Sequence, residues 1–317
     1  MGTTDSVRHI VGELRENGGN WGWWRGRIRR YINEPVQQSL SPRSESTNFL
    51  DKQWDTLVII DGCRADLFEE LNFDNSFDHY ERVRSNASAT PEWLQHTFNE
   101  HGDIVYISSN PMVSRHQPDA FHEMVEVWRD NLDPETSVVP PEAITEAALK
   151  AREEYPNKRL IVHYLQPHYP FIGYPDLNYT NMTYDDLGLD AKNHQHEDIA
   201  STWDALREGL VEKDETLEAY AENLKVVMED VNSLLNQLDE RVVVTSDHGN
   251  MYGGRSWPVP IRVFGHPRNL RLGELVTVPW GVDEGPRREI KNDSVSAESN
   301  ATDETVSERL QGLGYLE

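Results

Sequence analysis

The sequence predicts an α/β protein with a mostly parallel central sheet and helices on both faces. The first observation is that apolar residues form continuous runs, without alternating polar residues, at 56–61, 104–107, 160–165 and 242–247. Strands that are covered on both faces have this pattern. The second observation is that helical patterns lie between these runs. Strands that alternate with helices form parallel sheets, whose chemistry gathers at the carboxyl ends of the strands.

Two shorter strands and two long helices complete this prediction. The apolar runs at 261–264 and 275–278 are the additional strand candidates. Residues 140–155 predict a helix that begins with two prolines, which the first helical turn tolerates. In a second predicted helix the apolar residues recur every three or four positions and form one stripe, made of Leu217, Tyr220, Leu224, Val227, Val231, Leu234 and Leu238.

Composition divides the chain into three parts. Residues 1–50 form an N-terminal extension rich in Trp and Arg, with five acidic residues and seven Arg. Residues 51–281 form the α/β domain, and residues 282–317 form an acidic C-terminal tail. Within the tail, residues 291–307 are almost devoid of apolar side chains and predict a solvated linker or a disordered segment. The apolar end at 308–316 is expected to dock on the body of the protein.

The N-terminal extension contains a short segment, residues 21–32, in which aromatic residues lie beside clustered Arg. Such a segment suits a peripheral contact with a membrane interface or with an anionic partner. The alternative is a helix whose Trp side chains pack onto the core while the Arg side chains remain solvated. Gly22 and Gly26 weaken a long amphipathic helix here, and this second interpretation is favoured.

The chain is strongly acidic, with 55 acidic and 30 basic residues and a formal charge of −25. Its mean hydropathy is −0.69, yet 9% of its residues are aromatic, which argues against a disordered chain. Only seven of the basic residues are Lys. Many carboxylates with few Lys resemble the surfaces of proteins from salt-loving archaea, and an ordinary acidic cytosolic protein is the alternative. The charge repels phosphates, so we expect no nucleic-acid partner.

The sequence also predicts where the protein resides. No apolar run reaches the roughly 20 residues that span a bilayer, and the N-terminus lacks the apolar stretch of a secretory signal. The single Cys excludes a disulfide framework and a Cys-rich zinc module. We therefore expect a cytoplasmic protein, with residues 21–32 as a candidate for a peripheral membrane contact.

Candidate metal ligands follow two of the predicted strands. Asp61 comes at the end of one run, and Asp247, His248 and Gly249 follow another. Two carboxylates and an imidazole that converge at one sheet edge can bind a divalent cation. The alternative is that each Asp caps a following helix, which is a common role at such junctions.

Candidate catalytic residues lie in three other segments. Ser88 and Thr90 precede Pro91 at a predicted helix start, where a hydroxyl can cap the helix or act as a nucleophile that carries an anionic group. His168 lies in a proline-bounded loop after the run at 160–165, and His266 follows the run at 261–264. Either imidazole can bind a substrate oxyanion or protonate a leaving group.

In this order, these motifs resemble the sulfatase-like branch of the alkaline phosphatase superfamily, in a form typical of halophilic archaea. The resemblance spans about residues 54–280 and the closing Leu-Gly-Tyr-Leu. It implies an alkaline-phosphatase-like fold and one divalent metal ion (Zn, Mn, Ca or Mg), with the ligands Asp61, Asp247, His248 and Thr90. It also implies a covalent intermediate on Thr90 or Ser88, with His168 or His266 binding the transferred group or protonating the leaving oxygen.

Departures from the family pattern favour phosphate over sulfate esters. Sulfatases mature a Cys in Cys-x-Pro-x-Arg, whereas the single Cys here is followed by Arg64, Ala65, Asp66 and Leu67. The paired Asp of sulfatases is replaced by Asp61 and Gly62, and a second metal motif is absent from the sequence. The expected function is hydrolysis or transfer on phosphate esters, with surface glycans or glycolipids as candidate substrates. The alternatives are a sulfatase with an unusual nucleophile and an inactive binding or scaffold protein.

Overall fold

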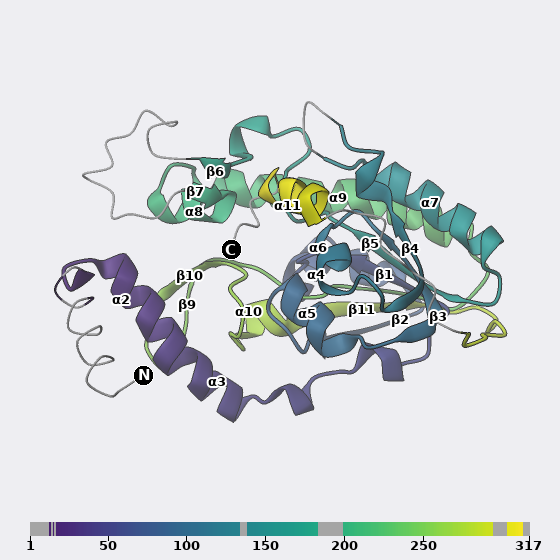
Figure 1. Cartoon of the computed structure of the whole chain (residues 1–317), viewed down its shortest axis with the longest axis horizontal. Helices are drawn as coiled ribbons and strands as arrows, with labels where there is room; N and C mark the ends of the chain where they lie inside the picture. Colours follow the sequence, from purple (N-terminus) through teal and green to yellow (C-terminus); the bar gives the residue numbers. More distant parts are fainter. Residues whose placement is uncertain are drawn as a thin grey trace.

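A seven-stranded sheet forms the centre of the computed structural model, which describes residues 13, 15, 17–133, 138–182, 199–293 and 303–312. The strand order is β2-β11-β8-β1-β5-β3-β4 (Figure 1). Strands β8, β1, β5, β3 and β4 run parallel, whereas β11 runs antiparallel to β8 and to β2. The predicted mostly parallel sheet is confirmed. Its strands are β1 Thr56–Ile60, β2 His79–Arg84, β3 His101–Ser108, β4 Phe121–Glu126, β5 Arg159–Tyr164, β8 Val242–Thr245 and β11 Thr277–Asp283.

Helices cover both faces of this sheet. Successive side chains of a strand point to opposite faces, and in β5 the ring of His163 contacts Trp93 of α5 while the Tyr164 hydroxyl contacts Thr145 of α7. Helices α5 and α7 therefore lie on opposite faces, and α9 packs beside α7. The α-helices of the body are α4 Ala65–Glu70, α5 Thr90–Thr97, α6 Met112–His116, α7 Pro141–Glu154, α8 Thr202–Glu208, α9 Lys213–Leu235, α10 Gly273–Val276 and α11 Asp303–Gly312.

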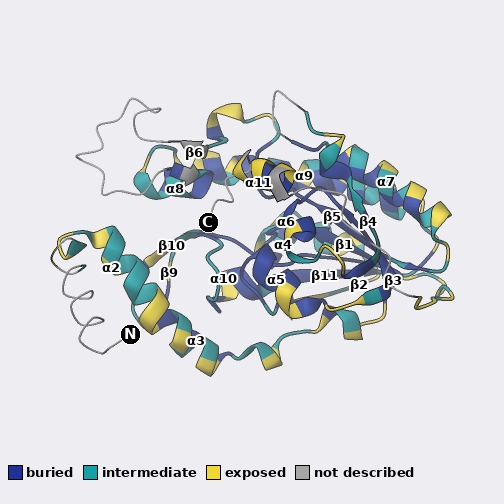
Figure 2. Cartoon of the chain, viewed as in Figure 1, coloured by how far each residue is buried: buried dark blue, intermediate teal, exposed yellow. Residues whose placement is uncertain are grey.

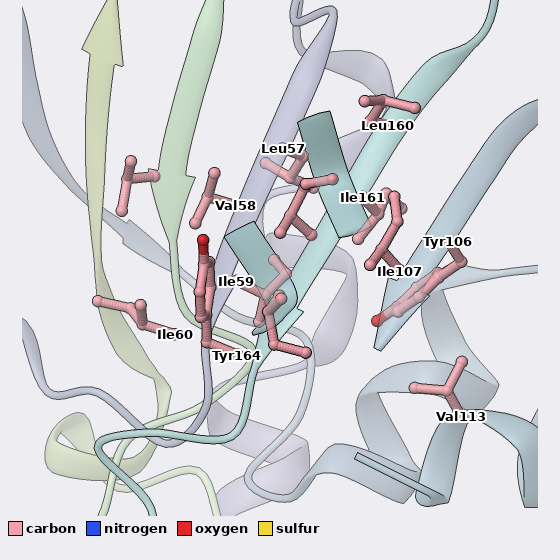
Figure 3. Packing of buried hydrophobic residues seen from close by; sticks show 14 of the residues in the cluster. Leu57, Val58, Ile59, Ile60, Tyr106, Ile107, Val113, Leu160, Ile161 and Tyr164 are labelled. Carbon is pink, nitrogen blue, oxygen red and sulfur yellow. The ribbon is translucent and has the colours of Figure 1, made fainter. Parts of the chain in front are cut away.

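The apolar runs became strands because both of their faces are buried. All five residues of β1 are buried, and so are all four of β8 (Figure 2). Figure 3 shows the aliphatic side chains of β1 and β5 packed together with Tyr106 of β3. This core fixes the strands in register, so that Ile59 of β1 lies opposite Thr245 of β8. The polar residues that follow the two strands are thereby brought to the same edge.

The shorter strand candidates lie elsewhere than the sequence suggested. Residues Arg262–Gly265 form β10, which pairs with β9 (Met251–Arg255) in a separate hairpin and not in the central sheet. Leu275 and Val276 end α10, and the following strand begins at Thr277. A third sheet pairs β6 (Thr180–Met182) with β7 (Ile199–Ser201). Short 3₁₀ turns occur at Arg43–Glu45, Phe49–Asp51, Phe73–Ser76, Val127–Arg129 and Pro175–Leu177.

The N-terminal extension forms one continuous helix despite its glycines. It consists of α2 (Trp21–Ile28), a π-helical turn (Arg29–Asn33) and α3 (Glu34–Leu40), and in Figure 1 it lies beside the β9–β10 hairpin. Trp21 is 59% exposed and Trp24 is 37% exposed. The interpretation that the Trp side chains pack onto the core is therefore wrong for these two residues, because the helix docks through polar side chains on another face.

The C-terminal tail is more ordered than its composition suggested. Residues 303–307, assigned above to a linker, begin helix α11, which buries Val306 and Leu310 at 5% and 1% exposure. The two side chains lie four residues apart and so form one apolar edge. Residues 294–302 and 313–317 lie outside the described part of the chain. Within the described residues, no helix combines the length and apolarity needed to cross a membrane.

Candidate active site

Two buried carboxylates meet where neighbouring strands β1 and β8 end. Asp61 directly follows β1, and Asp247 comes two residues after β8. Both side chains are fully buried, as is His248. Neither Asp caps a following helix: α4 begins after Arg64 at its N-cap, and Asp247 precedes a strand. The capping alternative is thus excluded for both residues.

Asp61 is held by donors from three different elements. Its Oδ2 accepts hydrogen bonds from Asn110 Nδ2 at 2.7 Å and from Thr90 Oγ1 at 3.3 Å, and it lies 3.3 Å from His163 Nε2. Burial alone would raise the pKa of Asp61, but the hydrogen bond from His163 and the nearby imidazoles of His168 and His248 lower it. The carboxylate is therefore ionised, and its Oδ1 has no hydrogen-bond partner.

In Asp247, as in Asp61, one carboxylate oxygen accepts hydrogen bonds and the other has no hydrogen-bond partner. Oδ1 accepts from the backbone N–H groups of Gly62 and His248 at 3.0 and 2.9 Å. Oδ2 is buried and has no hydrogen-bond partner. Gly62 adopts a left-handed conformation (φ +69°), and a Cβ there would lie 3.4 Å from the His248 ring. A glycine thus lets the turn after β1 approach the site closely.

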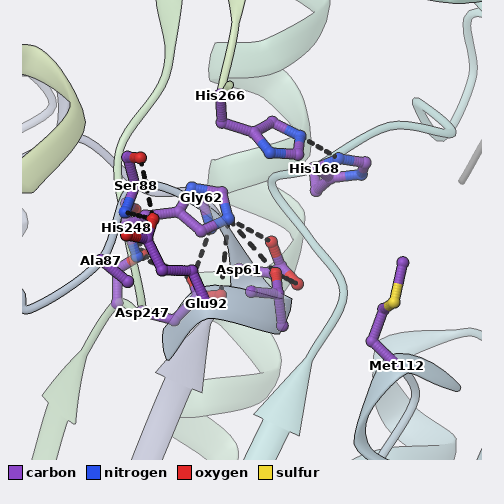
Figure 4. A network of polar contacts seen from close by, with 12 residues as sticks. Asp61, Gly62, Ala87, Ser88, Glu92, Met112, His168, Asp247, His248 and His266 are labelled. Atoms are coloured by element: carbon purple, nitrogen blue, oxygen red, sulfur yellow. Dashed lines mark hydrogen bonds and ion pairs between the residues drawn. The ribbon is translucent and has the colours of Figure 1, made fainter. Parts of the chain in front are cut away.

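His248 presents its Nε2 to these orphaned oxygens. Its Nδ1 lies 2.8 Å from the Gly249 carbonyl and donates to it, which leaves Nε2 as the nitrogen that can bind a cation. Nε2 lies 3.7 Å from Asp61 Oδ1 and 3.5 Å from Asp247 Oδ2 (Figure 4). It also lies 3.2 Å from Thr90 Oγ1. Four potential ligand atoms therefore surround one point.

This donor set fits a divalent cation. Buried carboxylate oxygens without a partner are costly, and a cation between Asp61, Asp247 and His248 would satisfy both of them. Asp61, His163 and Asp247 also bring ligand atoms within 4.8 Å of one another. However, the Tyr106 hydroxyl donates to His163 Nδ1 at 2.8 Å, which leaves the ring proton on Nε2, facing Asp61. The His163 proton thus faces Asp61, whereas His248 Nε2 faces the two oxygens that have no hydrogen-bond partner.

The structure separates the two candidate nucleophiles. Thr90 is the first residue of α5, and its hydroxyl contacts Asp61 and His248. The Ser88 hydroxyl instead shares its single proton between the Pro267 carbonyl at 2.9 Å and Glu92 Oε2 at 3.1 Å. Only Thr90 therefore reaches the carboxylate–imidazole cluster.

His168 and His266 lie together at the edge of the cluster. Their Nε2 atoms are 3.0 Å apart, so one ring donates to the other, and the His266 ring stacks on His248 at 4.6 Å. Burial lowers the pKa of His168, and burial with the neighbouring His248 and His168 lowers that of His266. Both rings are therefore neutral at pH 7, and His168 Nδ1 carries its proton because it lies 2.5 Å from the Tyr169 carbonyl, which can only accept. His266 is thus the ring that donates its N–H across the pair.

Three residues of the site were not singled out from the sequence. Asn110 and His163 bind Asp61, and Glu92 accepts from the backbone N–H groups of Ser88 and Asn269 at 3.0 and 3.2 Å. Asn110 follows β3 at the same sheet edge, so its position after a predicted strand was the available signal. His163 lies inside an apolar run, where an ionisable residue is itself unusual.

No family model and no curated protein matches the sequence. Several solved structures are similar in fold. The soluble domain of lipooligosaccharide phosphoethanolamine transferase A from Neisseria meningitidis has a TM-score of 0.45 and 11% identity, over 72% of this chain and 75% of that chain. The lipoteichoic acid synthase LtaP from Listeria monocytogenes has a TM-score of 0.41 and 12% identity, over 88% of this chain and 78% of that chain. The phosphoglycerol transferase GacH from Streptococcus pyogenes, in complex with sn-glycerol-1-phosphate, has a TM-score of 0.40 and 10% identity, over 89% of this chain and 91% of that chain. Likenesses of this size do not assign the chain to a family.

Proposed function

We propose that this protein is a metal-dependent hydrolase or transferase that acts on phosphate esters through a covalent intermediate on Thr90. One observation carries this proposal. The Thr90 hydroxyl, the Nε2 lone pair of His248 and the orphaned oxygens of Asp61 and Asp247 converge on one buried point. If the two carboxylates had a purely structural role, both of these oxygens would accept hydrogen bonds.

The arrangement supports a double displacement at phosphorus. The Thr90 hydroxyl loses its proton as a bond from Oγ1 to phosphorus forms, and the bond from phosphorus to the ester oxygen breaks. The neutral His168–His266 pair carries this proton to the departing oxygen, which leaves as an alcohol. Water or an acceptor hydroxyl then attacks phosphorus and releases Thr90. A bound divalent cation would lower the pKa of the hydroxyl and neutralise charge on the transferred group.

The sulfatase and scaffold alternatives have less support. The Cys63 thiol is buried, has a pKa raised by burial and donates to the Arg64 carbonyl at 3.6 Å. It is thus not an activated nucleophile. Two buried carboxylates side by side, one of them the ionised Asp61, are unfavourable unless a cation lies between them. A scaffold protein that binds no cation would gain nothing from this arrangement.

An ester screen on metal-loaded protein tests the proposed function. We expect measurable turnover of aryl phosphate monoesters or diesters, and turnover of the matching aryl sulfate at least about tenfold slower. The control is the same protein after chelation, which should lose turnover and regain it on metal addition. Faster cleavage of the sulfate would replace phosphate with sulfate chemistry. No turnover of any ester by metal-loaded protein would favour the inactive scaffold.

We further propose that the protein works in the cytoplasm of a halophilic cell, with α2 in peripheral contact with an anionic membrane surface or glycolipid. Support comes from the charge of −25, and from the exposed side chains of Trp21, Trp24, Tyr31 and Ile32 on the N-terminal helix. Aromatic residues beside Arg suit that interface. The acidic surface disfavours nucleic acid.

The charge also predicts a requirement for salt. Residues 51–317 carry −27, so their repulsion grows when the screening length rises to about 10 Å near 0.1 M salt. We expect the protein to lose helical circular dichroism on dialysis from about 3 M to about 0.1 M KCl, and to regain it when salt is restored. A signal that stays constant over that range would contradict the halophilic interpretation.

A further inference from the structure

A large cavity lies between the N-terminal helix, α8 and strand β10. Its volume is about 970 Å³. Its wall is unusually basic for this protein, because six guanidinium groups and only two carboxylates line it: Arg25, Arg29, Arg30, Arg207, Arg262 and Arg268, with Glu34 and Asp204. The formal charge of this lining is +4, in a chain whose total charge is −25. We call it the arginine cavity.

The two carboxylates of the arginine cavity are engaged by two of the arginines. Arg29 Nε lies 3.2 Å from Glu34, and Arg207 Nη1 lies 2.5 Å from Asp204. Among the residues that the structure describes, neither Arg30 nor Arg262 forms an ion pair with a carboxylate. Both are exposed to solvent. The positive charge of the cavity is therefore accessible to a ligand.

A second cavity of about 620 Å³ adjoins the first, since both are lined by Arg25, Arg207 and Arg262. It adds Lys213 and Arg255, and no carboxylate lines it. Its remaining wall includes aromatic and aliphatic side chains: Trp21, Leu206, Tyr252, Pro260 and Phe264. The two cavities form one basic band along the hairpin.

The N-terminal helix forms a wall of the arginine cavity because two buried amides fix it in place. Asn33 and Gln37 each donate to Ser256 Oγ at 3.0 Å, and Gln37 Oε1 accepts from the Arg271 backbone at 2.8 Å. About two turns before Asn33, Gly26 lines the cavity, and a Cβ there would meet nothing within 4 Å. The glycine therefore leaves space that a side chain would fill.

The arginine cavity adjoins the candidate active site through the chain that follows β10. Phe264 and Pro267 line the cavity, and His266 between them contacts His168 and stacks on His248. Residue His266 is itself partly exposed. The segment 264–267 therefore contacts both the candidate active site, through His266, and the arginine cavity, through Phe264 and Pro267.

We propose that the arginine cavity binds a second phosphate group, carried by the part of the ester that is not transferred. Guanidinium groups bind phosphate through paired charge-assisted hydrogen bonds, and several of them in one concave site select for more than one negative charge. The inference that this second phosphate belongs to the substrate rests on the proposed function. The inference that the cavity binds a phosphate group is independent of the proposed function.

Binding to metal-free protein tests the cavity separately from catalysis. Without a cation, Asp61 and Asp247 repel anions, so a soluble phosphate probe reports on the cavity. The probe is inorganic pyrophosphate, titrated calorimetrically at one salt concentration at which circular dichroism shows every variant folded. We expect binding that weakens at least about tenfold in Arg30→Gln/Arg262→Gln, and within twofold of the parent in Arg82→Gln, a control that replaces an exposed arginine paired with Glu69.

A second variant keeps every charge and removes the space. Gly26→Leu should weaken pyrophosphate binding at least about fivefold and favour the helix, whereas Gly19→Leu, at another open glycine outside the cavity, should leave binding unchanged.

Vesicles of phosphatidic acid in phosphatidylcholine, compared with phosphatidylcholine alone, show whether a lipid phosphate enters the same site. Loss of binding of either probe in both cavity variants supports the proposal. Equal binding of both probes by parent and variants, or no binding by the parent, overturns it.

Turnover tests the assignment to the substrate. For a pair of esters that differ by one additional phosphate, kcat/KM of the parent should favour the bisphosphorylated ester. That preference should fall at least about tenfold in Arg30→Gln/Arg262→Gln and persist in Arg82→Gln. A preference that the cavity variant retains would refute the substrate assignment. Failure of all turnover with intact pyrophosphate binding would instead refute the proposed function and leave the anion site in place.

Discussion

Replacing Asp247 with Asn and His248 with Ala is expected to abolish stoichiometric binding of a divalent cation and to lower turnover at least about a hundredfold. The double variant removes one orphaned carboxylate oxygen and the His248 Nε2 that lies 3.5 Å from it. Asp61 alone cannot replace them, because its Oδ2 is already occupied by Asn110, Thr90 and His163. Metal analysis of protein purified in high salt gives the stoichiometry directly.

The effect on stability separates a metal site from a structural carboxylate. In metal-free protein, Asp247→Asn removes a buried negative charge beside Asp61 and should leave the free energy of unfolding unchanged or raise it. In metal-loaded protein the same variant should be less stable than the parent, because bound metal stabilises only the parent. Asp239→Asn, at an exposed site, is the matched control. If the folded Asp247→Asn/His248→Ala variant still bound one metal ion per chain, Asp247 and His248 would not be the ligands.

The sequence predicted those parts of the site that depend on where buried strands end. Asp61 and Asp247 each follow a continuous apolar run, and hydrophobic burial on both faces forces such runs into neighbouring strands. The position of His168 after β5 was predictable for the same reason, whereas His266 follows β10, which lies in a separate hairpin outside the central sheet. Thr90 was recognisable from Pro91, since proline marks the first turn of a helix.

Other features depend on tertiary contacts that leave no local pattern. Strand β2 (His79–Arg84) has only one buried residue, Val83, so it lacks an apolar run and is held by its pairing with β11. The N-terminal helix docks through Asn33 and Gln37, two polar residues whose burial no hydropathy pattern indicates. The arginine cavity likewise combines residues that are more than 230 positions apart in the sequence, such as Arg25 and Arg262.

Thr90→Ala is expected to abolish turnover and the covalent intermediate, while Ser88→Ala retains measurable activity. The Thr90 hydroxyl is the only one of the two that contacts Asp61 and His248. It does not cap α5, whose N-cap residue is Ala89, so its loss should cost only about 1 kcal/mol of stability. Thr90→Ser, which keeps the hydroxyl, should retain activity within about tenfold of the parent and form the same adduct.

The position of the covalent label decides between the two hydroxyls. The intermediate is trapped by rapid acid quenching during turnover of a productive ester, and peptide mass spectrometry then locates the added group. Ser88→Ala serves as the structural control, because it removes hydrogen bonds to Glu92 and Pro267 and should raise KM or lower stability without preventing labelling. A label on Ser88 would move the nucleophile but keep the mechanism. Full activity in the Thr90→Ala/Ser88→Ala double variant would exclude covalent catalysis by this segment, because neither candidate hydroxyl would remain to accept the transferred group.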